Sequence, residues 1–148
     1  MITYRSATMM DLPVLASLDR EYFPYSPWPI EQFRAELSGK TRNFLVAEMD
    51  GEIIGYAGAF LPNAGGEADI MTIAVNPEHR RKGIASHFIS ELENWAKSRG
   101  ADSMMLEVIT TNESGIALYE KVGYQKLNIR KNYYGYGNDA QVMKKLLK

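Results

Sequence analysis

The sequence predicts an α/β fold built on a mixed β-sheet, in a single domain that covers residues 1–148. One observation is a run of strand-like segments joined by tight turns, which is typical of antiparallel neighbours. A second is a long amphipathic segment between two further strand-like runs, which is typical of a helical crossover. The length supports one domain with a hydrophobic core and is too short for two ordinary domains.

Hydrophobic periodicity and turn residues set the expected elements. Asp50-Gly51 predicts a two-residue hairpin turn. Thr8 and Asn112 are suitable helix N-caps, and Gly100 and Gly123 follow helix ends. In chain order, the expected elements are a strand at 2–5, helices at 8–22 and 29–37, strands at 44–48, 52–61 and 70–75, a helix at 84–99, a strand at 103–109, a helix at 113–121, and strands at 124–128 and 140–146.

The composition is that of an ordinary globular protein, with 45% hydrophobic and 24% charged residues. A net charge of −1 argues against a broad nucleic-acid surface. The absence of cysteine excludes disulfides and is compatible with a cytoplasmic location, and with only two histidines no metal centre is expected. Because the sequence has no long apolar run and no signal-peptide core, neither a membrane span nor secretion is expected.

A basic turn separates the expected strand at 70–75 from the long helix. It reads Arg80-Arg81-Lys82-Gly83. Free N–H groups, the positive end of the helix dipole and these cations would face one spot, which favours an anion site for phosphate; the alternative is a solvated loop. The Walker and dinucleotide-binding patterns are absent. The pattern present is R-x-x-G-x-A at 80–85, whose small residues would let a pyrophosphate approach the main chain.

This R-x-x-G-x-A pattern resembles the acetyl-coenzyme A signature of the GNAT acetyltransferases. The run LEVITTNESGIALYEKVGY at 106–124 resembles the second coenzyme A segment of that family. Together with IRKNYYGYG near the end, it is similar to the bacterial ribosomal-protein-alanine N-acetyltransferases. The resemblance spans nearly the whole chain. It implies a mixed, mostly antiparallel sheet flanked by helices on both faces, and acetyl-CoA as co-substrate without a metal.

The resemblance also implies which residues hold acetyl-CoA. The central strand would offer main-chain groups to the pantetheine arm, and the basic turn would hold the pyrophosphate mostly through N–H groups. An asparagine at the start of the short helix would bond the coenzyme besides capping the helix. The residues concerned are Ile73, Ala74, Val75, Arg80, Arg81, Lys82, Gly83, Ile84, Ala85, Ser86 and Asn112.

Glu107 is the candidate general base. It stands mid-strand between Met105 and Ile109, where a carboxylate is expected to be partly removed from water and so to bind a proton more readily. An ordinary glutamate at a solvated sheet edge is the competing interpretation. The resemblance favours the base, because the glutamate of this L-E-V segment is the proton acceptor in the ribosomal-protein enzymes.

Tyr119 is the candidate general acid. A phenol with a pKa of about 10 is protonated at neutral pH and can donate a proton to a thiolate. By composition alone Tyr119 is as well explained by packing, and the resemblance assigns the role, since the family places its general acid at a matching L-Y element. Because no cysteine can carry an acetyl group, direct transfer in a ternary complex is expected.

Other acid–base groups compete with this pair. Glu67 and Asp69 precede the expected central strand, where many GNAT enzymes keep their base. His79 is expected in the basic turn and His87 in the first turn of the long helix. No carboxylate or nucleophile is evident beside either histidine in the sequence, so neither is expected to be catalytic.

The resemblance implies that the acceptor is the N-terminal α-amine of a ribosomal protein of the small subunit. Trp28 and the final connection, with Arg130, Tyr133 and Tyr134, would flank its entrance. Burial as a core side chain is the preferred interpretation of Trp28 from sequence alone. Two other functions stay open: transfer to a small-molecule amine or lysine side chain, and a non-catalytic acetyl-CoA sensor.

Overall fold

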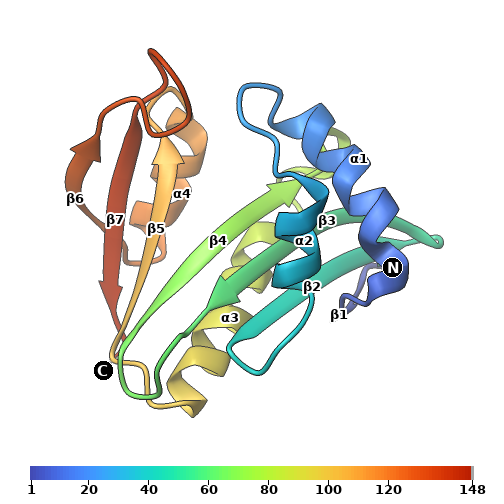
Figure 1. Cartoon of the computed structure of the whole chain (residues 1–148), viewed down its shortest axis with the longest axis horizontal. Coiled ribbons are helices and arrows are strands. Elements are labelled where there is room, and N and C mark those ends of the chain that lie inside the picture. The colour runs from blue at the N-terminus through green and yellow to red at the C-terminus, as the bar shows by residue number, and fades with distance from the viewer. Residues whose placement is uncertain (148) are drawn as a thin grey trace.

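The computed structural model describes residues 1–147. One sheet runs in the order β1-β2-β3-β4-β5-β7-β6, and only β4 and β5 pair in parallel. This confirms the mixed, mostly antiparallel sheet (Figure 1). The elements are β1 (Thr3–Ser6), η1 (Met9–Asp11), α1 (Leu12–Tyr22), α2 (Ile30–Glu36), β2 (Arg42–Met49), β3 (Glu52–Phe60), β4 (Glu67–Val75), η2 (Pro77–His79), α3 (Ile84–Ser98), β5 (Ser103–Ile109), α4 (Glu113–Lys121), β6 (Gln125–Arg130) and β7 (Ala140–Leu146).

Helices cover both faces of the sheet, as expected. On one face, Leu15 of α1 and Phe33 of α2 pack against β2 and β3 in one apolar cluster. On the other face, Phe88 of α3 belongs to a larger cluster, against which Leu118 of α4 also packs. The helices α3 and α4 therefore lie on the same side of the sheet, opposite α1 and α2 (Figure 1).

Local signals explain most element boundaries. Thr8 and Asp11 form a capping box at the start of η1. Asp50 and Gly51 have φ angles of 53° and 80°, as the tight turn between β2 and β3 requires. The strand β4 starts at Glu67, so Glu67 and Asp69 lie within it and do not precede it as expected. Main-chain pairing with both β3 and β5 extends the strand, whatever charge its side chains carry.

The two central strands, β4 and β5, are paired over a short stretch only. β4 and β5 pair only at Glu67–Ile70 with Ser103–Leu106, and the rest of each strand diverges (Figure 1). A β-bulge at Met71, which has no partner between Thr72 and Ile70 in the pairing with β3, falls at the point of divergence. Within residues 1–147, no helix has both the length and the apolar character needed to cross a bilayer.

Candidate active site

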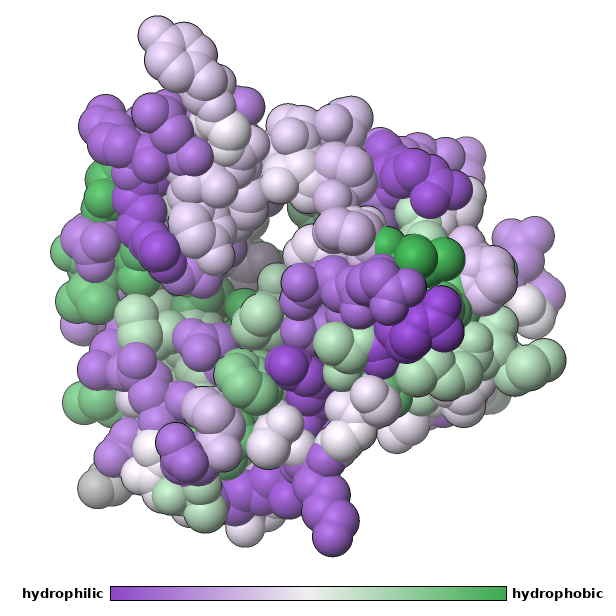
Figure 2. Space-filling model, viewed as in Figure 1, coloured by the Kyte–Doolittle hydropathy of each residue, from purple (hydrophilic) through white to green (hydrophobic). Residues whose placement is uncertain are grey.

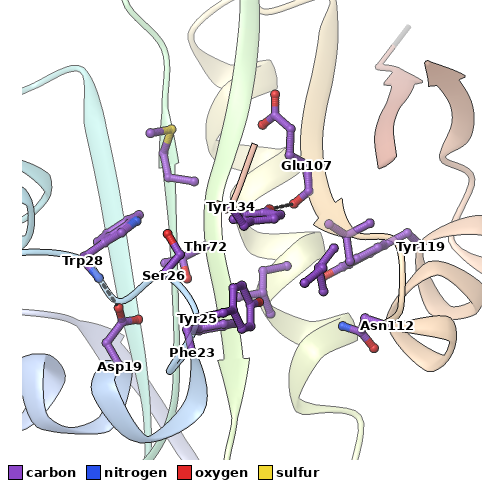
Figure 3. A pocket seen from close by; sticks show the side chains of 14 residues that line it. Asp19, Phe23, Tyr25, Ser26, Trp28, Thr72, Glu107, Asn112, Tyr119 and Tyr134 are labelled. Carbon is purple, nitrogen blue, oxygen red and sulfur yellow. Dashed lines mark hydrogen bonds between the residues drawn. The ribbon is translucent and has the colours of Figure 1, made fainter. Parts of the chain in front are cut away.

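A cavity opens where β4 and β5 diverge. It holds about 560 Å³ of space, including its mouth, and Figure 2 shows the surface hollowed between the part carrying β5 and β7 and the part carrying α1 and α2. The lining comes from five parts of the chain (Figure 3): Asp19, Phe23, Tyr25, Ser26 and Trp28 of α1 and its connection to α2; Met71, Thr72 and Ile73 of β4; Glu107, Val108 and Ile109 of β5; Asn112 and Tyr119 at α4; and Tyr134 of the β6–β7 connection.

The edge of β4 that borders this cavity lacks a strand partner. Beyond Ile70, β4 pairs with β3 on one side only, because β5 has turned away. Main-chain groups near Thr72 and Ile73 are therefore free to pair with an extended ligand. Of the three expected strand residues, Ile73 lines the cavity and Val75 is half-buried, whereas the Ala74 side chain is buried in the core on the α1 face.

The basic turn has the geometry of an anion site. Gly83, with φ 76°, is the N-cap of α3 and provides no side-chain acceptor for the N–H groups of Ile84, Ala85 and Ser86. Arg80, Arg81 and Lys82 are exposed, and none forms an ion pair with another described residue. A Cβ atom built on Gly83 would meet nothing within 4 Å, so a ligand has room to approach the main chain there.

Glu107 is a half-buried carboxylate that pairs with a cation. Its Oε2 accepts a hydrogen bond from Arg130 Nη1 at 3.2 Å, and its side chain is 21% exposed. Its main-chain oxygen accepts a hydrogen bond from the Tyr134 hydroxyl at 3.0 Å. In Figure 3 the carboxylate points away from Tyr25 and Asn112, beyond the Tyr134 ring. Arg130 and Tyr134 therefore hold Glu107 through its side chain and its main chain respectively.

Tyr119 enters the same cavity from α4. Its ring packs edge-on against Tyr124 at 6.3 Å between centroids. Burial, with a smaller contribution from Tyr25, raises the pKa of Tyr119 to about 12. The phenol therefore remains protonated at neutral pH. Asn112 Oδ1 accepts the N–H of Gly115 at 3.0 Å, so its capping role is confirmed and its side chain also lines the cavity.

Asp69 lies on the same face of the sheet as Glu107, at the end of the paired stretch. It stands opposite Met105, two residues before Glu107. Burial, then repulsion from Glu107 and Glu67, raises the pKa of Asp69 to about 6. Glu67 differs, because it forms an ion pair with Lys144 at 3.1 Å. Neither Asp69 nor Glu67 is among the residues that line the cavity.

The expected acceptor residues divide into two groups. Trp28 and Tyr134 line the cavity. Trp28 also packs against Phe33 at 5.0 Å between ring centroids and is half-buried, in line with the packing interpretation preferred from sequence. Arg130 and Tyr133 do not line the cavity: the guanidinium carbon of Arg130 lies 4.4 Å from the centroid of the Tyr133 ring, and Tyr133 in turn meets Tyr134 edge-on at 5.0 Å between centroids.

Sequence reasoning missed several lining residues. Tyr25 meets Tyr134 edge-on at 5.6 Å between centroids, across the gap between the two halves of the sheet. Asp19 and Thr72 also line the cavity. The tyrosines of segment 24–29 and of the last connection were visible in the sequence, but nothing in their spacing indicated that they meet.

The histidines lie outside the cavity lining. His87 stacks on Tyr4 at 3.6 Å between centroids and its Nε2 lies 2.7 Å from Glu91 Oε2. His79 contacts Lys82 at 3.2 Å. Across residues 1–147, no group of three or more histidine, aspartate or glutamate side chains is arranged to hold a metal ion.

Comparison with known proteins places this geometry in a family. The model of the acetyltransferase (GNAT) family matches residues 12–124. The N-alpha-acetyltransferase RimI of Mycobacterium tuberculosis is 31% identical over 150 residues, which cover 97% of this chain and 92% of that protein. An uncharacterized protein of Mycobacterium leprae is 33% identical over 97% of this chain, which spans only 40% of that longer protein.

A solved structure shows the same fold. The crystal structure of the ribosomal-protein-S18-alanine N-acetyltransferase from Escherichia coli matches with a TM-score of 0.85 and 27% sequence identity, over 100% of this chain and 95% of that one. The resemblance indicated by the sequence motifs is thus confirmed. With the family model matching most of its length, the protein belongs to the acetyltransferase (GNAT) family and is an acetyl-CoA-dependent N-acetyltransferase.

Proposed function

We propose that this protein transfers the acetyl group of acetyl-CoA directly to the α-amine of a protein N-terminus, with a small-subunit ribosomal protein as acceptor. The observation that carries the proposal is that Glu107 and Tyr119 line one cavity, next to the free edge of β4. The names of the M. tuberculosis and E. coli relatives, an N-alpha-acetyltransferase and a ribosomal-protein-alanine N-acetyltransferase, support this acceptor class. A ribosomal acceptor would place the reaction in the cytoplasm.

The residues around the cavity suit acetyl-CoA. The open space at Gly83, the uncapped N–H groups of α3 and the unpaired cations of the basic turn suit a pyrophosphate. The free edge of β4 at Thr72 and Ile73 suits the amide groups of an extended pantetheine arm. Asn112 would add a hydrogen bond from its side-chain amide.

Bound acetyl-CoA supplies a thioester, whose carbonyl carbon forms a bond to the acceptor nitrogen while the bond to sulfur breaks. Glu107 takes the proton of the incoming ammonium group, which leaves a nucleophilic amine. Tyr119 donates a proton to the departing sulfur. Glu107 passes the first proton to solvent and then takes the second proton, which the nitrogen loses as the amide forms. Once Glu107 releases this proton as well and Tyr119 regains one from solvent, the products are the amide, the free thiol and one proton. Direct transfer requires both substrates to be bound together.

The acceptor would enter between the two aromatic walls. Trp28 and Tyr134 line the cavity from opposite halves of the molecule, and Tyr133, with Arg130 over its ring, packs against Tyr134. Aromatic walls with a few polar groups suit a peptide end, which is mostly main chain.

An acceptor screen tests the proposal. The purified protein is given acetyl-CoA with a peptide that has a free α-amine, the same peptide blocked at its N-terminus but containing lysine, and a small polyamine, and thiol release is measured. We expect turnover with the free α-amine alone. Turnover with only the lysine peptide or the polyamine would contradict the proposal and identify that amine as the acceptor class. Coenzyme binding without turnover of any amine would indicate a non-catalytic sensor.

A deletion strain tests the ribosomal acceptor. Mass spectrometry of its ribosomal proteins should show one small-subunit protein that has lost N-terminal acetylation. An unchanged acetylation pattern would exclude this class of acceptor.

Initial-rate kinetics test direct transfer. With both substrate concentrations varied, double-reciprocal plots should give intersecting lines, whereas the parallel lines of a ping-pong mechanism would contradict direct transfer.

A further inference from the structure

Asp19 is a buried carboxylate that the mechanism above does not use. It lies in the last turns of α1, is 2% exposed and lines the cavity. Its Oδ1 accepts a hydrogen bond from the Tyr56 hydroxyl at 2.6 Å, and its Oδ2 accepts one from the main-chain N–H of Trp28 at 2.7 Å. Distances this short are typical of an ionised acceptor. The pKa of Asp19 is nevertheless raised, because burial raises it by more than these two hydrogen bonds lower it.

The two hydrogen bonds of Asp19 join three parts of the fold. Tyr56 is fully buried in β3, so it is a fixed point. Trp28 stands near the end of the connection between α1 and α2, and Figure 3 shows its N–H directed at Asp19. Three prolines in this connection, at 24, 27 and 29, have no N–H groups of their own. The bond to Asp19 is therefore one of few anchors available to the connection.

The same connection forms the acceptor side of the cavity. Tyr25, midway along it, meets Tyr134 edge-on at 5.6 Å, and Tyr134 in turn holds the main chain of Glu107. A shift of Trp28 would move Tyr25, and with it the contact that spans the gap between the two halves of the sheet. The effect would therefore reach the acceptor wall that this connection forms.

We propose that Asp19 is a positioning residue that fixes the 23–29 connection as the acceptor wall, by holding Trp28 N–H against the buried Tyr56. The inference rests on the proposed function, since it assumes that the acceptor binds along this wall. It predicts that loss of the Asp19 carboxylate weakens acceptor use selectively and loosens Trp28.

Asp19→Asn is the test variant, because an amide retains the shape of the carboxylate but cannot accept a hydrogen bond at both positions. Asp11→Asn is the matched control: Asp11 is also buried in the first half of the chain and pairs with Arg5, but it does not line the cavity. We expect Asp19→Asn to raise the acceptor KM on the order of tenfold, as for loss of one hydrogen bond to a charged group, with the acetyl-CoA KM unchanged. Asp11→Asn should leave both constants unchanged at temperatures where it is folded.

A second readout needs no activity. In a Trp95→Phe background, Trp28 is the only tryptophan. Asp19→Asn should then shift Trp28 emission to longer wavelength and increase its quenching by acrylamide, and Asp11→Asn should do neither. Unchanged Trp28 emission and quenching in Asp19→Asn, or equal changes in both substrates' KM values, would overturn the proposal. If the wild-type protein fails to acetylate any α-amine, the proposed function fails, while the fluorescence result still decides whether Asp19 holds the connection.

Discussion

At the scale of single residues, Glu107 and Tyr119 lie where a strand and the next helix bring them to one cavity. The strand and the helix start were predictable, the strand from the alternation of its residues and the helix start from Asn112. Their surroundings were not. Arg130, which lies 23 residues further along the sequence, donates a hydrogen bond to Glu107. Tyr25, in the first quarter of the chain, contributes to the raised pKa of Tyr119. Such pairs form only when the β6–β7 hairpin and the α1–α2 connection are in place.

Glu107→Gln and Tyr119→Phe should each lower kcat by about 10²-fold or more, the usual range for a general base or acid, with little change in acetyl-CoA affinity. Steady-state kinetics and coenzyme titration measure the two effects. Glu48→Gln and Tyr4→Phe are matched controls, because Glu48 also pairs with an arginine at 26% exposure and neither residue lines the cavity. Wild-type rates in both test variants across pH 6 to 9 would rule out the assigned acid and base.

Asp69→Asn should stabilise the protein at neutral pH. The pKa of Asp69 is raised to about 6 in the folded state, so the folded protein binds this proton more tightly than the unfolded chain. The contribution of protonated Asp69 to the stability of the folded state is complete below the pKa of an unfolded aspartate, about 4. It is lost as pH rises through the folded-state pKa of about 6. The variant should therefore melt at a higher temperature than the wild type near pH 8 and at a similar one near pH 4. Thermal melts at the two pH values test this; a lower melting temperature near pH 8 contradicts it.

At the scale of elements, α3 and the turn before it form the proposed anion site. The left-handed Gly83 lets the chain enter α3 without a side-chain cap, so the first N–H groups stay available. The R-x-x-G-x-A pattern was enough to predict this, because an anion site at a helix start is local in sequence. The divergence of β4 from β5 was not predictable, since it depends on pairing between strands more than 30 residues apart.

Gly83→Ala should raise the KM for acetyl-CoA and leave the acceptor KM unchanged, because a methyl group would occupy the space at the helix start. It should also cost about 1–2 kcal/mol of stability, since alanine is strained at φ 76°. Gly51→Ala separates the two effects: Gly51 has φ 80° and similar open space, but it lies in the β2–β3 turn. Equal kinetic changes in both variants would mean that backbone strain alone is responsible.

At the scale of the whole molecule, the cavity is built from both halves of the sheet, so a co-substrate bound as proposed would bridge them. Acetyl-CoA at 100 times its Kd should stabilise the folded state by about 2.7 kcal/mol. For a chain of this size, that corresponds to a rise in melting temperature of about 5–10 °C. Differential scanning fluorimetry measures the shift, with adenosine as a control that lacks the pyrophosphate and the arm. A melting temperature that does not respond to acetyl-CoA would exclude a preformed co-substrate site.

The sequence by itself determined the features that depend on neighbours in the chain. These are the order of strands and helices, the tight turn at Asp50-Gly51, the basic helix start at 80–86 and the elements that carry Glu107 and Tyr119. Only the tertiary structure decided that β4 and β5 separate after Ile70, that Tyr25 meets Tyr134 across the gap, and that Asp19 ties Trp28 to Tyr56. The physical reason is that short-range periodicity and turn chemistry act within a few residues, whereas a cavity is made by contacts between segments that the chain brings together only on folding.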